Sequence, residues 1–229
     1  MKAQSMDLDK IDYLGLDRVL KRGSGDTVAE RDGALLIRDR ISGAYMLACD
    51  DAVAGASLLD RHIGRDCGLL MVSDHKLGIT AFEKYGFSEK LECFQTAYYG
   101  KKPPVDPRLS FVTAEEADLP MLTEAYRLIS PEELERVVGR RSILFGYHEG
   151  RCVGFIGEHL EGSMGILYVF PEFRRRGFGA ALQKHLISKT MDEGFIPFGQ
   201  VEKDNRNSLD LQKKVGMTVS DDLIVWMWR

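Results

Sequence analysis

The chain has 229 residues, of which 44% are hydrophobic and 29% charged, and its formal net charge is −4. This composition supplies enough apolar material for a packed core and excludes an intrinsically disordered chain. The acidic balance argues against a general affinity for nucleic acid or anionic lipid, although a local basic cluster could still hold a phosphate-bearing ligand.

The cysteines and the start of the chain bear on the cell compartment. None of the four cysteines shows a CxxC-type spacing and three lie in apolar runs, so we expect reduced structural thiols and no metal site. The first residues lack the apolar stretch of a signal peptide, and no run reaches the ~20 apolar residues of a membrane span. We therefore expect a cytoplasmic protein without a membrane partner.

A proline-rich segment divides the chain. Residues 101–107 contain two lysines and three prolines, which prevent both a helix and a central strand. The sequence thus predicts a domain at residues 1–102, a linker at 103–107 and a second domain at 108–229.

Before the linker, the hydrophobic pattern predicts the order β-β-α-β-α-β. The elements expected are strands at Ala34–Arg38 and Ala44–Cys49, a helix at Ala52–His62, a strand at Leu69–Val72, a helix at Leu77–Tyr85 and a strand at Glu92–Tyr99.

After the linker, a short strand at Leu109–Val112 is expected to lead into a helix that ends near Arg127, with Thr113 and Glu116 as its capping box. Pro131 is placed to begin a second helix, which would stop at Gly139. The later elements expected are strands at Ile143–Tyr147, Cys152–Glu158 and Ser163–Phe170, a helix at 177–193, a strand at Phe198–Val201, a helix from Asn205 to Lys214 and a strand at Leu223–Trp228.

The segment Val169–Leu182 carries the strongest chemical signal: a strand that stops at a proline, a basic loop and then a helix. Glycines let a ligand approach the backbone, the first N–H groups of a helix lack internal partners, and the helix dipole favours an anion. Such a loop can cradle a pyrophosphate. It is not a Walker loop, because no Gly-Lys-Ser/Thr follows.

This segment resembles the acyl-CoA-binding motif of the GNAT superfamily, Arg/Gln-x-x-Gly-x-Gly/Ala, which Arg174, Gly177 and Gly179 match. The resemblance implies a mixed α/β (α+β) fold with a mostly antiparallel central sheet, and acetyl-CoA or another acyl-CoA as co-substrate. It also implies that the loop amides hold the CoA pyrophosphate and that the preceding strand binds the pantetheine arm. The implied binding residues are Leu167, Val169, Arg174, Arg175, Arg176, Gly177, Phe178, Gly179 and Ala180.

The residues from Val201 to Met217 resemble a second motif of the family, a helix of the form Asn-x-x-Ala/Ser-x-x-Leu-Tyr-x-x-x-Gly-Phe. The resemblance places Asn205 and Ser208 on the CoA arm, whereas the alternative makes Asn205 only a helix cap. The features that look closest to the glycine N-acyltransferase-like branch are Gly162-Ser163-Met164 with the basic loop, Ile196-Pro197-Phe198, the helix from Asn205 to Gly216, and Trp226 with Trp228.

The catalytic groups depart from the family pattern. Where relatives place a glutamate base this chain has Ser163, and Glu161, two residues earlier, would share its face of the strand. His159 is a third candidate because it could accept a proton near neutral pH. Gln212 stands where many relatives have a tyrosine acid, and it can donate a hydrogen bond but not a proton.

Gly86 and Gly216 occupy matching places in the two halves, which suggests a tandem repeat. The first half has Cys49-Asp50-Asp51 where a phosphate loop would lie, so we expect it to have lost CoA binding and to complete an acceptor pocket, cover a sheet edge or form a homodimer. The leading hypothesis is an N-acyltransferase that acylates the amine of a small molecule or an amino acid. The alternative is a noncatalytic acyl-CoA-binding or regulatory protein.

Overall fold

The computed structural model describes residues 6–31 and 33–229. The first five residues, part of the segment in which we expect no signal peptide, lie outside the described residues. These residues divide into two compact units. The first unit contains the chain up to residue 96 together with residues 200–206 and 219–229. The second unit contains residues 97–199 and 207–218.

The first unit is built on a seven-stranded sheet with the order β1-β2-β3-β4-β11-β5-β10. Its strands are β1 (Gly25–Arg31), β2 (Ala34–Asp39), β3 (Tyr45–Cys49), β4 (Leu69–Val72), β5 (Glu89–Ala97), β10 (Phe198–Glu202) and β11 (Thr218–Trp228). β3 pairs with β4 in parallel, whereas the β1–β2, β2–β3 and β4–β11 pairs are antiparallel.

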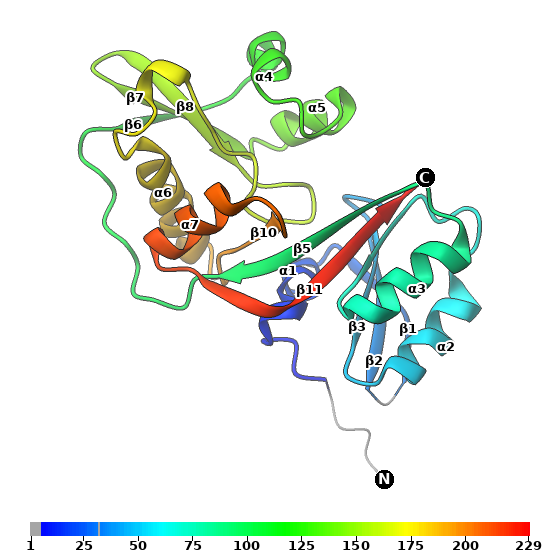
Figure 1. Ribbon diagram of the computed structural model, residues 1–229. Coiled ribbons are helices and arrows are strands. Elements are labelled where there is room, and N and C mark those ends of the chain that lie inside the picture. Colours follow the sequence, from blue (N-terminus) through cyan, green and yellow to red (C-terminus); the bar gives the residue numbers. More distant parts are fainter. Residues whose placement is uncertain (1–5, 32) are drawn as a thin grey trace. The chain divides into compact units, whose positions relative to one another are not determined.

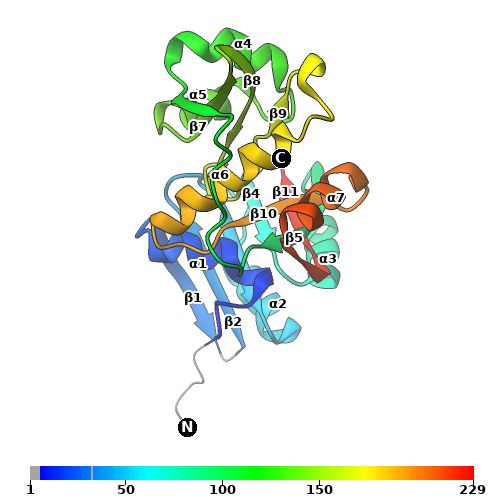
Figure 2. The same cartoon turned by 90° about the vertical axis from the view of Figure 1, so that its left-hand side faces the viewer.

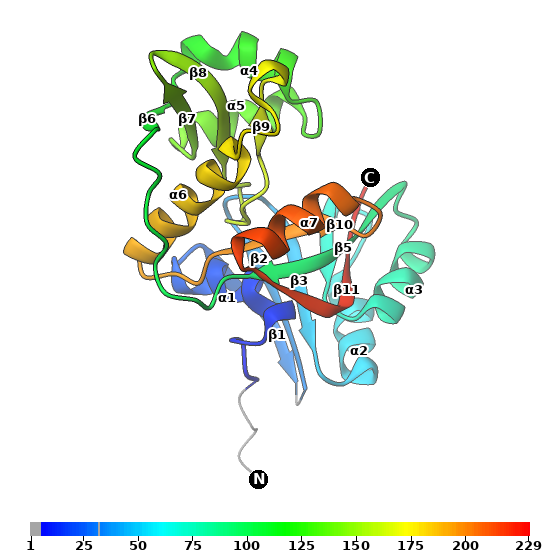
Figure 3. The same ribbon diagram turned by 60° about the vertical axis from the view of Figure 1, so that its left-hand side comes forward.

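Alternating side chains of this sheet build two cores, because successive residues of a strand face opposite sides. Leu36, Leu47 and Val225 pack on the side covered by α2 (Ala52–His62) and α3 (His75–Tyr85). Ile37, Met46 and Trp226 pack on the other side, against α1 (Leu14–Lys21). Figure 3 shows α2 and α3 next to each other on one side of these strands.

The last strand of the chain lies inside the first-unit sheet, between β4 and β5. β11 pairs with β4 in antiparallel register, from Val225 opposite Val72 to Trp228 opposite Leu69. The first compact unit therefore includes segments from both sides of the proline-rich linker. Strand partners so far apart in the chain leave no mark on local composition, unlike the linker, and the division into two consecutive domains stays a prediction.

The second unit has a four-stranded sheet with the order β6-β7-β8-β9. The strands are β6 (Ser110–Thr113), β7 (Ile143–His148), β8 (Arg151–Gly157) and β9 (Tyr168–Val169), and all their pairings are antiparallel. Figure 1 shows α6 (Phe178–Asp192) on one side of β7 and β8, and α4 (Leu119–Ala125) with α5 (Pro131–Gly139) on the other. Leu144 and Ile156 pack with α6, whereas Phe155 meets Tyr126, which follows α4, edge to face.

The mixed, mostly antiparallel α/β architecture expected from the sequence is confirmed, and α2, β4 and α5 have the predicted bounds. Two local predictions were wrong, and one part of the fold was not predicted. The capping box is formed by Glu115 and Asp118, not by Thr113 and Glu116. The strand expected at Ser163–Phe170 is regular only at β9, and α1 with β1 had not been predicted.

Candidate functional site

The segment that joins β9 to α6 is the basic loop singled out in the sequence. After β9 the chain makes a single 3-10 turn, η3 (Pro171–Phe173), and then enters α6, as Figure 2 shows. Arg175 and Gly177 both adopt left-handed backbone conformations, with φ of 62° and 85°. Gly177 occupies the N-cap position of α6, where it contributes no side-chain cap.

The first amides of α6 are available to a ligand. The first backbone hydrogen bond of the helix runs from Ala181 N–H to the Gly177 carbonyl, at 3.1 Å. The described part of the chain supplies no acceptor for the N–H groups of Phe178, Gly179 and Ala180. Three parallel N–H groups at the positive end of a 15-residue helix form an anion site suited to a pyrophosphate.

The space in front of these amides is open. A Cβ atom built on Gly177 would have only the Arg108 guanidinium within 4 Å, at 3.9 Å. At Gly179 it would lie 3.6 Å from Val169 and 3.9 Å from Leu211, which is ordinary van der Waals distance. Gly177 is therefore required by its backbone conformation, whereas Gly179 leaves room beside the helix.

β9 is the edge strand of its sheet, as a pantetheine-binding strand would be. Phe170 N–H donates to the Val153 carbonyl of β8 at 3.0 Å, so the backbone groups of alternate residues face β8. Those of Val169 therefore point away from the sheet, whereas Leu167 precedes the regular strand and its N–H donates to the Gly165 carbonyl at 2.8 Å. Further back, Met164 forms a parallel bridge with Gly199, which brings the start of β10 beside this segment at that one position.

The three arginines of the loop lie exposed around it. Arg174 Nε donates to the Val169 carbonyl at 2.9 Å, and its guanidinium lies 5.6 Å from the Tyr168 ring centre. Arg176 lies 5.8 Å from the ring centre of Phe173. Arg174 thus ties the loop to β9 as well as adding charge.

Two further arginines reach the same loop and were not found in the sequence. Arg108, just before β6, lies 5.2 Å from the Phe178 ring centre, and Arg151, at the start of β8, lies 4.7 Å from that of Phe173. Asp106 pairs with Arg108 at 2.6 Å, and Glu172 approaches Arg151 at 4.0 Å. Their separation from the motif, by tens of residues, left no signal that linked them to it.

Comparison with known proteins agrees with this geometry. Residues 145–227 match the model of a family described as FR47-like protein, and no curated protein sequence matches the chain significantly. A Drosophila protein of known structure has a TM-score of 0.62 at 14% identity, covering 99% of this chain and 98% of that chain.

Two further structures carry the family name. A putative GNAT-family acetyltransferase from Novosphingobium aromaticivorans has a TM-score of 0.57 at 18% identity, covering 97% of each chain. A GCN5-related N-acetyltransferase-like protein from Streptococcus suis has a TM-score of 0.56 at 16% identity, covering 94% of this chain and 92% of that one. The fold is GNAT-like. At such identities the likeness establishes the fold and leaves the activity of this chain to its residues.

The first unit contains another strand-to-helix junction, from β3 to α2, and the N-terminus of that helix is closed. α2 follows β3 as α6 follows β9, but Asp51 caps it by accepting from Val53 N–H at 2.8 Å and Ala54 N–H at 3.2 Å. The Asp51 carboxylate therefore occupies the place that a phosphate would need. β3 and β4 also stay paired over three residues, from Tyr45 to Leu47, whereas Met164 and Gly199 form a single bridge.

The second motif forms helix α7 (Arg206–Val215). Leu211 lies near Gly179, and Ser208, three residues earlier, shares that face of α7. Asn205 directly precedes the helix and falls in the first unit, so its contact with CoA stays a prediction.

The three candidate catalytic residues occupy a tight turn after β8, not a strand. His159 N–H donates to the Ser163 carbonyl at 2.9 Å, and Gly162 N–H donates to the His159 carbonyl at 2.9 Å. The Ser163 hydroxyl donates to the Glu161 carboxylate, and both residues are buried. The prediction that Glu161 and Ser163 share one face of a strand was therefore wrong, although the turn does bring them together.

His159 has a partner that the sequence did not reveal. Its Nδ1 lies 3.2 Å from a carboxylate oxygen of Glu133, in the first turn of α5. Burial lowers the pKa of His159, but the Glu133 hydrogen bond and the charges of Glu161 and Glu133 outweigh it, so the pKa is raised above its ordinary value. Glu133 is 26 residues away along the chain, which hid the pair.

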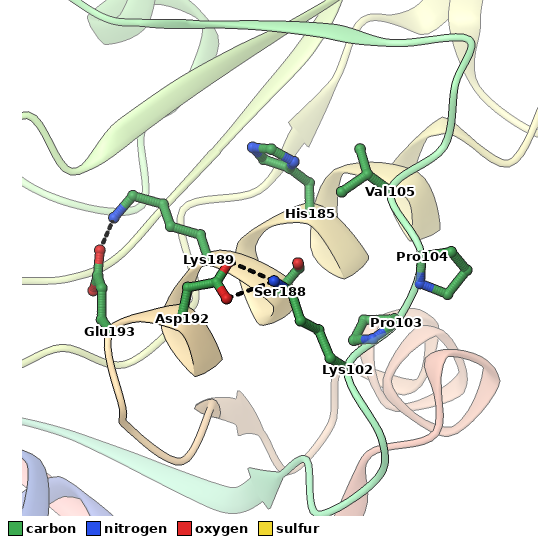
Figure 4. A pocket seen from close by; sticks show the side chains of 9 residues that line it. All are labelled: Lys102, Pro103, Pro104, Val105, His185, Ser188, Lys189, Asp192 and Glu193. Atoms are coloured by element: carbon green, nitrogen blue, oxygen red, sulfur yellow. Dashed lines mark hydrogen bonds and ion pairs between the residues drawn. The ribbon is translucent and has the colours of Figure 1, made fainter.

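The tryptophans and the linker play other parts. Trp226 is buried and donates from Nε1 to Gln200 at 2.7 Å, and Trp228 packs on the same core. Beside the linker, an open pocket of about 690 Å³ is bordered by α6, as Figure 4 shows. Lys102 reaches Asp192 there at 2.6 Å, so the linker packs along the end of α6 distant from the GNAT-like loop.

Residues 6–31 and 33–229 lack two features that other classes of function require. No helix among them is both long enough and apolar enough to cross a bilayer. No three His, Cys, Asp or Glu side chains among them gather as a metal ion would require.

Proposed function

We propose that the chain is an acyl-CoA-dependent N-acyltransferase, with acetyl-CoA as the expected donor and the amine of a small molecule or an amino acid as acceptor. The observation that carries this proposal is the N-terminus of α6, where three amides without internal acceptors face open space beside edge strand β9.

The parts of CoA match the parts of this site. Its pyrophosphate fits the amides of Phe178–Ala180, where backbone donors and the helix dipole favour two negative charges. Its pantetheine amides can bond with the N–H of Val169 and the carbonyl of Leu167, as an added strand would. The Val169 carbonyl already accepts from Arg174, and the Leu167 N–H already donates to Gly165. The exposed arginines of the loop supply positive charge for the remaining phosphate.

The reaction assigned to the site is direct transfer. A neutral amine attacks the thioester carbonyl, a C–N bond forms, the C–S bond breaks and CoA leaves as its thiolate. The chain then has to bind both reactants in line and accept one proton. This proposal includes membership of the branch that resembles glycine N-acyltransferases. It also includes the origin of the first unit as a degenerate copy, which is supported by the cap that Asp51 places on α2.

A noncatalytic acyl-CoA-binding protein is the second candidate. It is supported by Gln212, whose amide is paired with Gln183 inside the protein and does not present a proton donor. Acyl-CoA binding without turnover of any amine would favour it.

The test is a thermal shift with acetyl-CoA, repeated on Gly179→Glu and Gly179→Gln. A ligand at ~100 times its Kd stabilises the fold by about 2.7 kcal/mol. Glutamate in the first turn of α6 complements the helix dipole while repelling a pyrophosphate, so loss of the shift in a variant of unimpaired stability would assign the site. Gly179→Gln adds a side chain of the same size without a charge, so it separates the effect of the charge on binding from the effect of the added bulk. No shift in the folded wild type would overturn the proposal.

A further inference from the structure

The second unit contains an acid–base pair on the side of the sheet that carries α5. The pair joins Glu133, in the first turn of α5, to His159, in the turn after β8, and the two side chains are 33% and 23% exposed. A carboxylate against Nδ1 holds the imidazole in the tautomer whose proton is on Nδ1. Nε2 then carries the lone pair, and the described residues give it no hydrogen-bond partner.

The free nitrogen faces the chain segment that leads into β9. A Cβ atom on Gly165 would lie 2.6 Å from His159 Nε2, so only glycine leaves room for the ring in this position. The hydroxyl of Tyr126, the residue directly after α4, donates to the Gly165 carbonyl at 3.0 Å and so fixes the position of Gly165. Nε2 is thus held beside Gly165, two residues before Leu167, whose carbonyl belongs to the proposed acyl-CoA strand.

The surrounding charges favour a proton on this nitrogen. Glu133 from α5 and Glu161 from the same turn both act on the ring, and both stabilise an imidazolium. Burial raises the pKa of Tyr126, the other titratable group in contact with this segment, to about 12, so it stays neutral. The Glu161 carboxylate, by contrast, is buried and occupied by Ser163, which leaves His159 as the accessible group of the cluster.

We propose that His159 is the proton acceptor of the transfer reaction and that Glu133 is the residue that positions it. This inference rests on the proposed function. As the amine nitrogen bonds to the thioester carbon, its proton passes to His159 Nε2. The C–S bond then breaks, and the thiolate takes up a proton from the imidazolium or from water.

The experiment needs no knowledge of the acceptor. Diethyl pyrocarbonate acylates the unprotonated imidazole, and mass spectrometry gives the rate at each histidine as a function of pH. His159 is expected to react several-fold more slowly with saturating acetyl-CoA, while the exposed His62 of α2 reacts unchanged. In Glu133→Gln, the pKa obtained from the His159 rates should fall by roughly one pH unit, since a carboxylate in contact is lost.

Glu132→Gln is the matched control. Glu132 is the neighbouring carboxylate in the first turn of α5, so its replacement removes the same charge from the same helix end without touching His159. Its His159 pKa should stay near the wild-type value. If acetyl-CoA binds but leaves the His159 rate unchanged, or if the two variants shift the pKa equally, the inference is overturned and the proposed function survives. If acetyl-CoA does not bind at all, both fall.

Discussion

Gln183 of α6 and Gln212 of α7 bond to each other in the core of the second unit. Gln212 Nε2 donates to the Gln183 oxygen at 3.4 Å and Gln183 Nε2 donates back, and both residues are more than nine-tenths buried. Gln212, which stands where many relatives have a tyrosine acid, therefore directs an amide proton at Gln183.

Replacing one member of this pair should destabilise the protein more than replacing both. Gln212→Met leaves the Gln183 amide buried without a partner, which costs about 1–3 kcal/mol of unfolding free energy. The double variant Gln183→Met/Gln212→Met removes both polar groups and should recover most of that loss. Urea denaturation measures the three variants; additive losses would show that the amides contribute independently.

Asp51 should contribute to the stability of the protein but not to its affinity for acyl-CoA. Asp51→Ala removes the cap of α2 and is expected to lower the unfolding free energy by about 0.5–2 kcal/mol. Asp51→Asn keeps an acceptor oxygen while losing the same charge, so it should lose far less. Neither change should alter acetyl-CoA affinity by calorimetry; a second binding event in Asp51→Ala would mean that the first unit retains a CoA site.

Glu92 of β5 should give the first unit an acid-sensitive component of stability. Hydrogen bonds from His75, Lys203 and Lys90 hold the Glu92 pKa at about 2, below its ordinary 4.5. A carboxyl group whose pKa is lower in the folded than in the unfolded protein stabilises the fold at pH values above its unfolded pKa. This contribution is lost as the pH falls through the pKa of the folded protein.

Wild type should therefore be more stable than Glu92→Gln at pH 6, and the difference should shrink between pH 4.5 and about 2. Denaturation at fixed ionic strength tests this, since salt screens these half-exposed cations. A difference independent of pH would refute the ion-pair account. Lys203 lies in residues 200–206, which belong to the first unit although they follow the linker in the chain. Its ion pair with Glu92 therefore also stabilises the position of this segment against β5.

The sequence predicted those elements whose signals are local. Proline at the start and a periodic apolar face placed α5, and the strand–loop–helix pattern placed α6 with its open N-terminus. β1 was not predicted, because its partly exposed, charged residues show no alternation of apolar and polar side chains. β9 was overestimated, since Leu167 N–H donates to the Gly165 carbonyl in a tight turn inside the expected strand, and regular pairing begins only at Tyr168.

Long-range partners could not be predicted in this way. The position of β11 beside β4, the approach of Arg108 and Arg151 to the loop, and the pairing of Glu133 with His159 all depend on contacts between distant segments. Composition and spacing carry no information about such contacts in a single sequence. The chemical candidates were therefore found one residue at a time, without the neighbours that define their chemistry.

Arg174 should contribute to acyl-CoA binding through the shape of the loop as well as its charge. Its Nε hydrogen bond to the Val169 carbonyl joins the loop to β9, whereas Arg175, beside it, contributes exposed charge. Arg174→Met and Arg175→Met each remove one positive charge from adjacent positions. The first also removes the tie, so it should weaken acetyl-CoA binding by about 1 kcal/mol more, roughly fivefold in Kd.

Arg174→Gln separates the two contributions, because the glutamine amide can donate to the same carbonyl without a charge. Its Kd should resemble that of Arg175→Met at 0.15 M salt, and both should lose salt dependence to the same extent, since each has lost one charge. Isothermal titration at two salt concentrations measures this. If Arg174→Met and Arg175→Met bind equally, the hydrogen bond to Val169 has no part in forming the site, and the loop acts through charge alone.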